Sequence, residues 1–358
     1  MQEAALSDHH LGIEHDGPIR VGIAGLGRSG WNIHAKTIAE MPDQFRVVAV
    51  SDPSEERCQE AVKATGAKAF AHFEPFAAQR DLDLIVVASP NRLHAQQACD
   101  AMLSGKHVVC EKPMALTIED ADRMIEVASD TGHVLAPFQN RRYEPHFLKV
   151  QEIIASGVLG DIVQIRMEWS FFTRRWDWQT MKDQGGGALN NHCAHLVDHA
   201  VQLFGEEEPV VFADVKRTLS VGDAEDHVKI VLYGEGSPTI DLETSSACAY
   251  PEKRWRIFGT SGGLRGDTEH LEWKWVDWDE MPERELDPGA ANERKYQRED
   301  YPWQTDSWHA PSNPPSSGLS FYRDLAKCLR SGTPMPITPE SVRRQIAVVE
   351  VCRELCQV

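Results

Sequence analysis

The sequence lacks the features that mark membrane proteins, nucleic-acid-binding proteins and secreted proteins. No apolar run approaches the roughly 18 residues that a membrane-spanning helix needs. The N-terminal segment, residues 1–17, is polar and acidic, without the apolar stretch of a signal peptide. A net charge of −18 with no basic patch would repel a phosphate backbone. We therefore expect a cytoplasmic protein with neither a membrane nor a nucleic acid as partner.

Paired cysteines are also missing. The eight cysteines are scattered and form no CxxC pair, so neither a disulfide framework nor a zinc finger is indicated. Most of them lie among apolar neighbours, which predicts reduced, buried thiols. His9, His10 and His15 lie within residues 1–17, which we expect to form a solvated, flexible extension rather than a metal site.

What is present is a regular alternation of strands and helices. At 358 residues the chain exceeds the usual size of one hydrophobic core, so two domains are expected. From Ile19 onward, short apolar runs alternate with helical patterns that end in glycine, which predicts an α/β domain with a parallel sheet covered on both faces. The predicted strands are residues 19–25, 46–52, 82–89, 106–112 and 133–138.

The first predicted strand runs into the glycine motif GLGRSG. Gly25 permits a tight turn, Gly27 lets the backbone approach a pyrophosphate, and Gly30 lets helix and strand pack closely. Asp52, at the end of the second strand, would bind the adenosine ribose and repel a 2′-phosphate, which favours NAD over NADP. The alternative is a glycine turn without a ligand. The expected dinucleotide contacts here are Gly25, Gly27, Arg28, Ser29, Gly30 and Asp52.

Three stretches together resemble the Gfo/Idh/MocA family of NAD(P)-dependent oxidoreductases. They are VGIAGLGRSGWNIHA, VVASPNRLHAQQACDAMLSGKHVVCEKPMA and GGGALNNHCAH, and the resemblance extends from about Ile19 to the C-terminus. It implies a Rossmann domain, residues 18–139, joined to an α+β domain with a large, open, mostly antiparallel sheet, residues 140–335. It further implies a C-terminal segment, residues 336–358, that packs back on the first domain, and a homo-oligomer formed through the exposed face of the sheet.

The resemblance also assigns roles around the motif EKP. It implies that Lys112 is catalytic, with Glu111 and Pro113 shaping the turn beside the nicotinamide. The loop after the predicted strand 82–89 would contact the dinucleotide through Ser89, Pro90, Asn91 and His94. Both segments follow strands, at the sheet edge where open α/β sheets bind ligands. A lysine beside a cationic nicotinamide should have a depressed pKa; the alternative is a surface lysine at a strand end.

After the first domain the hydrophobic period changes to two. In DIVQIRMEWSFF, Val163, Ile165 and Met167 share one predicted face, as in a sheet with one apolar side. The segment TDSWHAPSNPPSSG, residues 305–318, is rich in proline and serine and is expected to be a loop that could cover the substrate pocket. Two closing helical patterns, within 321–332 and 338–355, are expected to pack on the first domain and to carry structure only.

Between the predicted sheet and a triple glycine lies FFTRRWDWQTMKDQGGG. Aromatic faces beside hydrogen-bond donors suit sugar rings, although the tryptophans could equally fill a domain interface. The expected substrate contacts, with two from the helix described next, are Arg142, Arg175, Trp176, Trp178, Asn191 and His195.

The stretch GGGALNNHCAHLVDH admits three interpretations. A metal site would use three histidines, but their spacing lacks the glutamate of HExxH, and we expect no metal. A purely structural polar helix is the second. In the third, implied by the resemblance, His195 and Asp198 match the family pattern while Asn191 replaces its aspartate. Asn191 cannot ionise and can only orient a hydroxyl, so His195 would act as general base, assisted by Lys112 and held by Asp198.

The function implied is hydride transfer between NAD(P) and a secondary hydroxyl or ketone of a sugar, inositol or related polyol. Two alternatives stay open. One is a lyase or glycosidase that retains its NAD and oxidises the sugar only transiently. The other is a non-catalytic regulator that binds the dinucleotide, for which Asn191 is the best argument.

Overall fold

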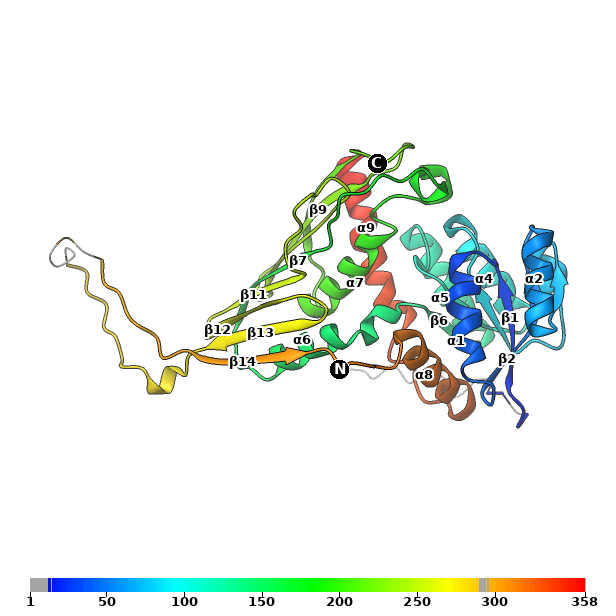
Figure 1. Cartoon of the computed structure of the whole chain (residues 1–358), viewed down its shortest axis with the longest axis horizontal. Coiled ribbons are helices and arrows are strands. Elements are labelled where there is room, and N and C mark those ends of the chain that lie inside the picture. Colours follow the sequence, from blue (N-terminus) through cyan, green and yellow to red (C-terminus); the bar gives the residue numbers. More distant parts are fainter. Residues whose placement is uncertain (1–11, 14, 290–293, 295, 358) are drawn as a thin grey trace.

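The structure, a computed structural model, describes residues 12–13, 15–289, 294 and 296–357 and divides into two layered domains (Figure 1). The first contains a six-stranded parallel sheet in the order β3-β2-β1-β4-β5-β6. This order places the topological switch point between β1 and β4. Its strands are β1 (Ile19–Ala24), β2 (Phe45–Ser51), β3 (Lys68–Phe70), β4 (Leu84–Val87), β5 (His107–Cys110) and β6 (Leu135–Pro137).

Helices connect these strands, and the five predicted strands are confirmed. The structure adds β3, which is too short and too exposed to give a periodic signal. Ser54 and Thr117 cap two of the helices through their hydroxyl oxygens, and Gly66 and Gly132 end the same helices in left-handed conformations. The helical segments are η1 (Gly30–Ala35), α1 (Lys36–Ala39), α2 (Glu55–Thr65), α3 (Phe73–Ala77), η2 (Asn91–Leu93), α4 (His94–Leu103), α5 (Ile118–Thr131) and η3 (Asn140–Tyr143).

The second domain contains an eight-stranded sheet in the order β14-β13-β12-β11-β7-β10-β9-β8, in which only β7 and β10 pair in parallel. The predicted mostly antiparallel sheet is confirmed. Its strands are β7 (Ile162–Glu168), β8 (Val210–Lys216), β9 (His227–Tyr233), β10 (Thr239–Ser245), β11 (Trp255–Gly259), β12 (Gly262–Gly266), β13 (His270–Trp275) and β14 (Gln304–His309). Three further short helices, η4 (Trp178–Thr180), η5 (Lys182–Gln184) and η6 (Trp278–Glu280), lie in its connections.

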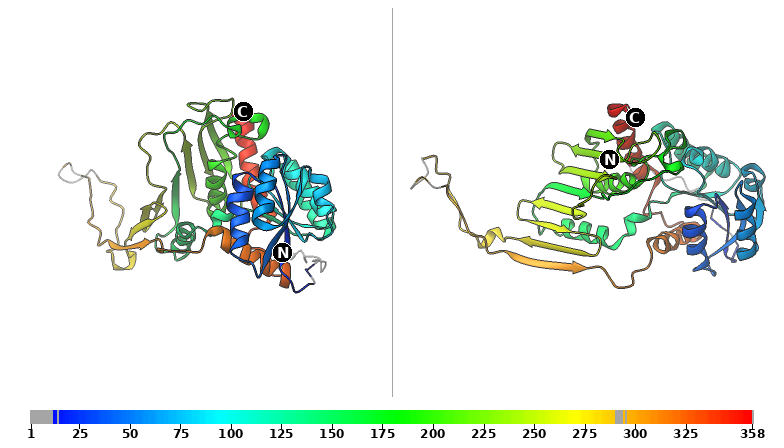
Figure 2. Two further views of the ribbon diagram at one scale, coloured as in Figure 1. Left: turned by 45° about the vertical axis from the view of Figure 1, so that its right-hand side comes forward. Right: turned by 45° about the horizontal axis from the view of Figure 1, so that its top comes forward.

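Helices cover one face of this sheet and leave the other open. Alternate residues of β9 and β10, such as Ile230 and Leu242, are buried against α6 (Pro145–Ala155) and α7 (His192–Phe204). On β7, Ile165 and Met167 are buried as predicted, whereas Val163 is exposed. In both figures α7 stands between the sheet and the first domain, while residues 281–289 and 296–300, between β13 and β14, extend away from both domains (Figures 1 and 2).

The two C-terminal helices, α8 (Ser317–Ser331) and α9 (Pro339–Cys356), unite the domains. Phe321 and Leu325 of α8 belong to the first hydrophobic core, so this helix packs on the first domain although the predicted boundary at 335 grouped it with the second. Helix α9 contributes Ile346 to the first core and Val349 to the second.

Two expectations about connecting segments are corrected. Residues 305–309 of the stretch rich in proline and serine belong to the edge strand β14, Gln304–His309, which pairs with β13. No residue of 305–318 lines the pocket between the domains that is described below. At the N-terminus, His15 Nε2 lies 2.9 Å from Asp83 Oδ2, so this histidine packs on the first domain, while His9 and His10 lie outside the described residues. In the part of the chain that is described, no helix has the length and apolarity of a membrane span.

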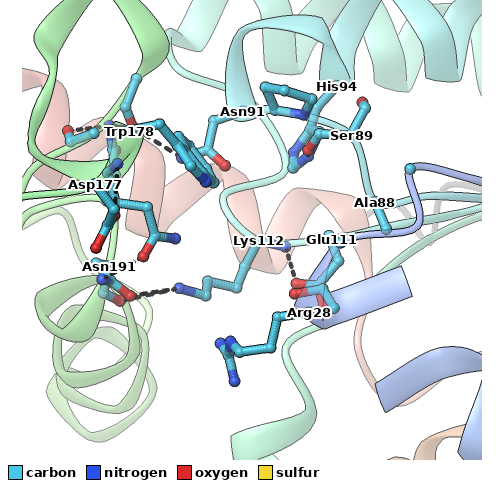
Figure 3. Close-up of a pocket in the computed structure, with 18 of the residues that line it drawn as sticks. Arg28, Ala88, Ser89, Asn91, His94, Glu111, Lys112, Asp177, Trp178 and Asn191 are labelled. Atoms are coloured by element: carbon cyan, nitrogen blue, oxygen red, sulfur yellow. Dashed lines mark hydrogen bonds between the residues drawn. The ribbon is translucent and has the colours of Figure 1, made fainter. Parts of the chain in front are cut away.

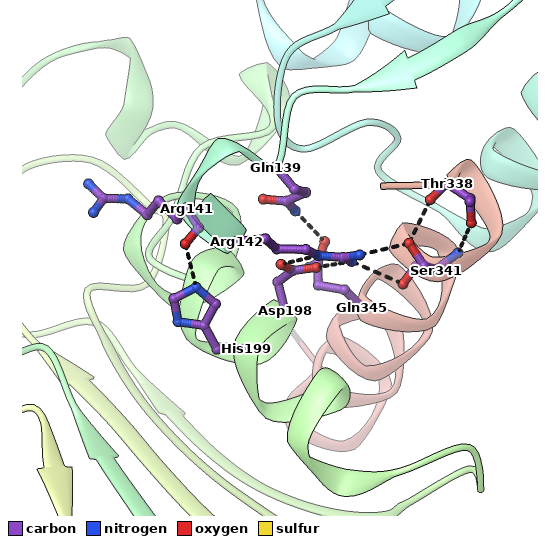
Figure 4. Close-up of polar contacts among 8 residues, drawn as sticks. All are labelled: Gln139, Arg141, Arg142, Asp198, His199, Thr338, Ser341 and Gln345. Carbon is purple, nitrogen blue, oxygen red and sulfur yellow. Dashed lines mark hydrogen bonds and ion pairs between the residues drawn. The ribbon is translucent and has the colours of Figure 1, made fainter. Parts of the chain in front are cut away.

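A buried ion pair ties the domains together (Figure 4). Arg142, from η3, donates from Nε and Nη2 to the two carboxylate oxygens of Asp198 in α7, at 2.8 and 2.6 Å, and from Nη1 to Ser341 Oγ in α9 at 2.8 Å. Arg142 was expected to contact substrate and Asp198 to hold His195. Both expectations are wrong, because each side chain is committed to the other in a buried, bidentate arrangement.

Removing one partner of this pair should destabilise the fold strongly. Asp198→Ala leaves a buried, uncompensated guanidinium, which costs about 3–5 kcal/mol, whereas Arg142→Met with Asp198→Leu removes both charges and should recover much of that loss. Urea unfolding followed by circular dichroism measures the change. Arg265→Gln, in the exposed pair with Glu272, is the matched control, and equal effects of the two single variants would contradict the role of burial.

Candidate active site

A pocket lies between the domains at the carboxyl ends of β1 and β4, where the strand order reverses (Figure 3). This is the position at which open α/β sheets bind ligands. From the first domain it is lined by Gly25, Gly27, Arg28, Ser29, Asp52, Arg57, Ala88, Ser89, Pro90, Asn91, His94, Glu111 and Lys112. From the second it is lined by Arg175, Asp177, Trp178, Gln179, Gly185, Gly186, Gly187, Asn190 and Asn191.

The glycine motif has the geometry that a dinucleotide needs. Gly25 has φ of +91°, and a Cβ there would lie 2.5 Å from the Ala88 carbonyl oxygen. A Cβ on Gly30 would lie 1.8 Å from the Gly25 oxygen, which explains why this glycine packs the helix on the strand without lining the pocket. Around Gly27, by contrast, a Cβ would meet nothing within 4 Å, so the backbone is open to a pyrophosphate.

Asp52 is fixed at the edge of the pocket. Its side chain is 5 % exposed, and its two oxygens accept from the backbone N–H of Leu26 at 2.7 Å and of Ser54 at 2.8 Å. Each carboxylate oxygen keeps a second acceptor site for a ribose hydroxyl. Arg57 Nη1 lies 3.7 Å from Asp52 Oδ2 but is largely exposed.

The loop after β4 joins the domains across the pocket. Asn91 Nδ2 donates to the Gly185 carbonyl oxygen at 2.8 Å, and Asn190 Nδ2 donates to the same oxygen at 2.9 Å. His94 is buried with its ring nitrogens 2.8 Å from the carbonyl oxygens of Ser89 and Pro113. Pro113 therefore supports the pocket from behind and does not line it.

Lys112 lies where the pocket meets the second domain. Its Nζ donates to Asn191 Oδ1 and to the Asn191 carbonyl oxygen, both at 3.3 Å (Figure 3). Burial lowers the pKa of Lys112 to about 8; Glu111 opposes this shift, and Arg141, Arg28 and Arg175 add to it. A lysine with this pKa can exist as amine or ammonium near neutral pH, which suits proton transfer.

A buried chain of hydrogen bonds supports this lysine. Glu111 accepts from the Lys112 backbone N–H at 2.9 Å and lies 3.2 Å from His34 Nε2, and His34 Nδ1 lies 2.8 Å from the Tyr322 hydroxyl. Burial alone would raise the Glu111 pKa, but His34 and Lys112 hold it at about 2. Tyr322 belongs to α8, which was expected to have a structural role only. The hydrogen bonds through His34 and Glu111 connect this helix to Lys112.

The three clustered histidines face different neighbours. His195 is 8 % exposed, does not line the pocket and has no partner for Nδ1 among the described residues. Burial, with Lys112 and Arg141, lowers its pKa well below the ordinary value. His199 stacks on Phe147 with ring centroids 3.8 Å apart, and His192 lies against Trp169. Within the described part of the chain, no three His, Cys, Asp or Glu side chains form a metal-binding group.

Only two of the three arginine and tryptophan residues predicted in segment 175–178 line the pocket. Arg175 and Trp178 line the pocket, but Trp176 is 77 % exposed and stands outside it. Two residues that the sequence did not indicate complete this wall. Asp177 pairs with Arg175, and Gln179 Oε1 accepts from Arg175 at 2.6 Å and from Asn191 Nδ2 at 3.3 Å.

Two alanine substitutions separate the roles of the glycines. Gly27→Ala places a methyl group in open space beside the predicted pyrophosphate position, so we expect NADH affinity to fall about tenfold with an unchanged melting temperature. Gly30→Ala forces a clash with backbone and should destabilise the fold by about 1–3 kcal/mol. Fluorescence titration with NADH and thermal unfolding measure the two effects. Unaltered NADH binding by Gly27→Ala would contradict the assignment.

Comparison with known proteins identifies the family. Residues 19–138 match the model described as "Oxidoreductase family, NAD-binding Rossmann fold", and residues 147–265 match the C-terminal domain model of the same GFO/IDH/MocA family. Together the two models cover more than half of the 358 residues.

Relatives and solved structures show the same similarity. Myo-inositol 2-dehydrogenase of Thermotoga maritima is 29 % identical over 70 % of this chain and 75 % of its own length. The 2,7-anhydro-N-acetylneuraminate hydratase of Escherichia coli is 28 % identical over 70 % and 68 %. The WlbA dehydrogenase of Bordetella pertussis, solved with NADH and UDP-GlcNAcA, has a TM-score of 0.78 at 24 % identity over 96 % of both chains, and so shares the fold. The chain belongs to the Gfo/Idh/MocA family of oxidoreductases, and its N-terminal domain is the NAD-binding Rossmann fold of that family.

Proposed function

We propose that this protein is an NAD-dependent dehydrogenase or reductase acting on a secondary hydroxyl or ketone of a sugar, inositol or related polyol. The observation that carries the proposal is the position of Lys112, whose Nζ lies between the glycine-motif pocket and the N-terminus of α7. The similarity to a myo-inositol dehydrogenase supports a polyol substrate.

The proton transfer is assigned to Lys112. NAD, when bound, supplies the hydride acceptor or donor. The amine form of Lys112 can take the proton of the substrate hydroxyl, and its ammonium form can return it in the reduction. Asn191 orients the same oxygen through its amide. His195, expected as the general base, has a depressed pKa and does not line the pocket, so it is the weaker candidate.

This assignment predicts a pH dependence. Lys112 must be neutral to accept a proton, so kcat for oxidation should rise as the pH rises through about 8, while kcat for reduction should fall. Lys112→Met should lower kcat by about 10²- to 10⁴-fold and leave NADH binding measurable. Lys112→Arg keeps the charge but does not titrate, and should be equally inactive. The absorbance of NADH measures kcat and its dependence on pH in each variant. If Lys112→Arg keeps the pH dependence of the unaltered protein, a group other than Lys112 transfers the proton.

Coenzyme choice gives a second test. The buried Asp52 carboxylate should repel a 2′-phosphate, so we expect the Kd for NADPH to exceed that for NADH by about tenfold or more. Asp52→Ser should reduce this ratio, whereas Asp81→Ser, at an exposed carboxylate of the same domain, is the control. Fluorescence titration measures each Kd, and equal Kd values in the unaltered protein would show that Arg57 accommodates the phosphate.

A second candidate has support from one relative. The similarity to a hydratase acting on an anhydro sugar favours a lyase-type reaction in which NAD is retained. A panel of sugars and polyols, followed by absorbance for NADH and by chromatography for products, separates the two. Release of NADH in proportion to ketone supports the dehydrogenase, product formation without net NADH supports the lyase, and NAD binding without any turnover supports a regulator.

We also propose a homo-oligomer formed through the open face of the large sheet. Val210 and Phe212 of β8 expose 52 % and 55 % of their surface there, opposite to Val211 and Ala213, which pack against the core. Such apolar exposure indicates an interface. The eight free cysteines fit a reducing, cytoplasmic environment.

A further inference from the structure

Beside Lys112 lies an aromatic and cationic cluster that the dinucleotide pocket does not include. Trp169 follows β7, and the guanidinium groups of Arg141 and Arg254 lie over its ring at 4.5 and 4.3 Å from the centroid. The same ring lies 5.2 Å from that of His192, the first residue of α7, which follows Asn191 and thus the contact with Lys112. Each of these four side chains is only partly buried, so the cluster is partly open to solvent.

The charges around this cluster do not balance. Arg141 is paired with Glu144, Arg175 with Asp177, and Lys112 is next to the ionised Glu111. Arg254 has no ion pair and donates no side-chain hydrogen bond to any residue that the structure describes. Its side chain contacts the Trp169 ring, and its backbone carbonyl accepts from the Glu168 N–H at 3.1 Å. The Glu144 carboxylate acts on Arg254 from a distance, but it is already paired with Arg141 and with His146. A partly buried guanidinium without a directly paired carboxylate is costly, and it remains charged at neutral pH.

We infer that the substrate carries an anionic group, a carboxylate or a phosphate, that pairs with Arg254 beside Trp169. Arginine presents a planar fork of donors that matches either anion in a bidentate arrangement. An anion here would supply the missing counter-charge, while the aromatic ring would hold the adjoining sugar carbons. This inference rests on the proposed function for the position of the reacting hydroxyl, since Lys112 and Asn191 would hold that end of the substrate.

The test uses substrates that differ at one carbon. D-glucose, D-glucuronate and D-glucose 6-phosphate, with the matching galactose series, are compared by calorimetric binding to the full-length protein in the presence of NADH, and by turnover with NAD. At least one anionic member should bind about tenfold or more tightly than its neutral parent. Preference for the acid identifies a carboxylate and preference for the ester identifies a phosphate. No preference for either anion in both series overturns the inference.

Variants assign the effect to Arg254. Arg254→Gln should reduce the ratio of anionic to neutral affinity about tenfold, and Arg254→Lys, which keeps the charge, should restore part of it. Arg256→Gln is the matched control, because Arg256 is exposed and its guanidinium lies over the Phe258 ring, 5.3 Å from the centroid, and not over Trp169. A preference that survives in Arg254→Gln overturns the inference.

The outcomes also separate this inference from the proposed function. Oxidation of neutral sugars with no preference for anions supports the dehydrogenase and overturns the anion site. Binding of anions that depends on Arg254, without hydride transfer in any series, supports the anion site and contradicts the dehydrogenase.

Discussion

The buried ion pair between Arg142 and Asp198 is the constraint on which the site depends. Neither domain alone contains the pocket, because its walls come from the glycine motif on one side and from residues 175–191 on the other. The pair fixes η3, which leads out of the first sheet, against α7, which carries Asn191 at its N-terminus. Ser341 of α9 completes the contact. Specific, bidentate geometry of this kind constrains orientation even where its net contribution to stability is small.

The same geometry concentrates positive charge around Lys112. Arg28 comes from the first domain, Arg141 from the junction and Arg175 from the second, and each of them lowers the pKa of Lys112. Lys112 and Arg141 in turn lower the pKa of His195. Burial is the larger cause, and these charges add to it. Together they lower the pKa of Lys112 to about 8 and the pKa of His195 well below its ordinary value. These shifts are the reason why we propose Lys112, and not His195, as the group that transfers the proton.

How much of the site could be predicted depends on the range of the interactions. The roles of Gly25, Gly27 and Gly30 follow from local turn geometry, so a short motif predicts them, and Asp52 follows from the end of one strand. The Arg142–Asp198 pair, by contrast, joins residues 56 positions apart, and the contact of His34 with Tyr322 spans 288. Nothing in the local sequence distinguishes these partners from other polar residues. Strand β14 was missed for another reason, since flanking prolines and serines obscured its six residues.

Asn191 is one of two positions, with Cys193, at which the helix departs from the family pattern that the sequence resembles, and the contacts of Asn191 give its departure a physical meaning. An aspartate at this position would place a negative charge close to the Lys112 ammonium, where the asparagine Oδ1 now lies at 3.3 Å. An opposite charge at that distance favours the protonated lysine and would raise its pKa. The neutral amide of Asn191 does not raise the pKa of Lys112 in this way. Its oxygen accepts from Lys112 Nζ, and its nitrogen donates to Gln179 Oε1. Asparagine at this position therefore adds no carboxylate beside Lys112 and leaves the lysine able to release its proton.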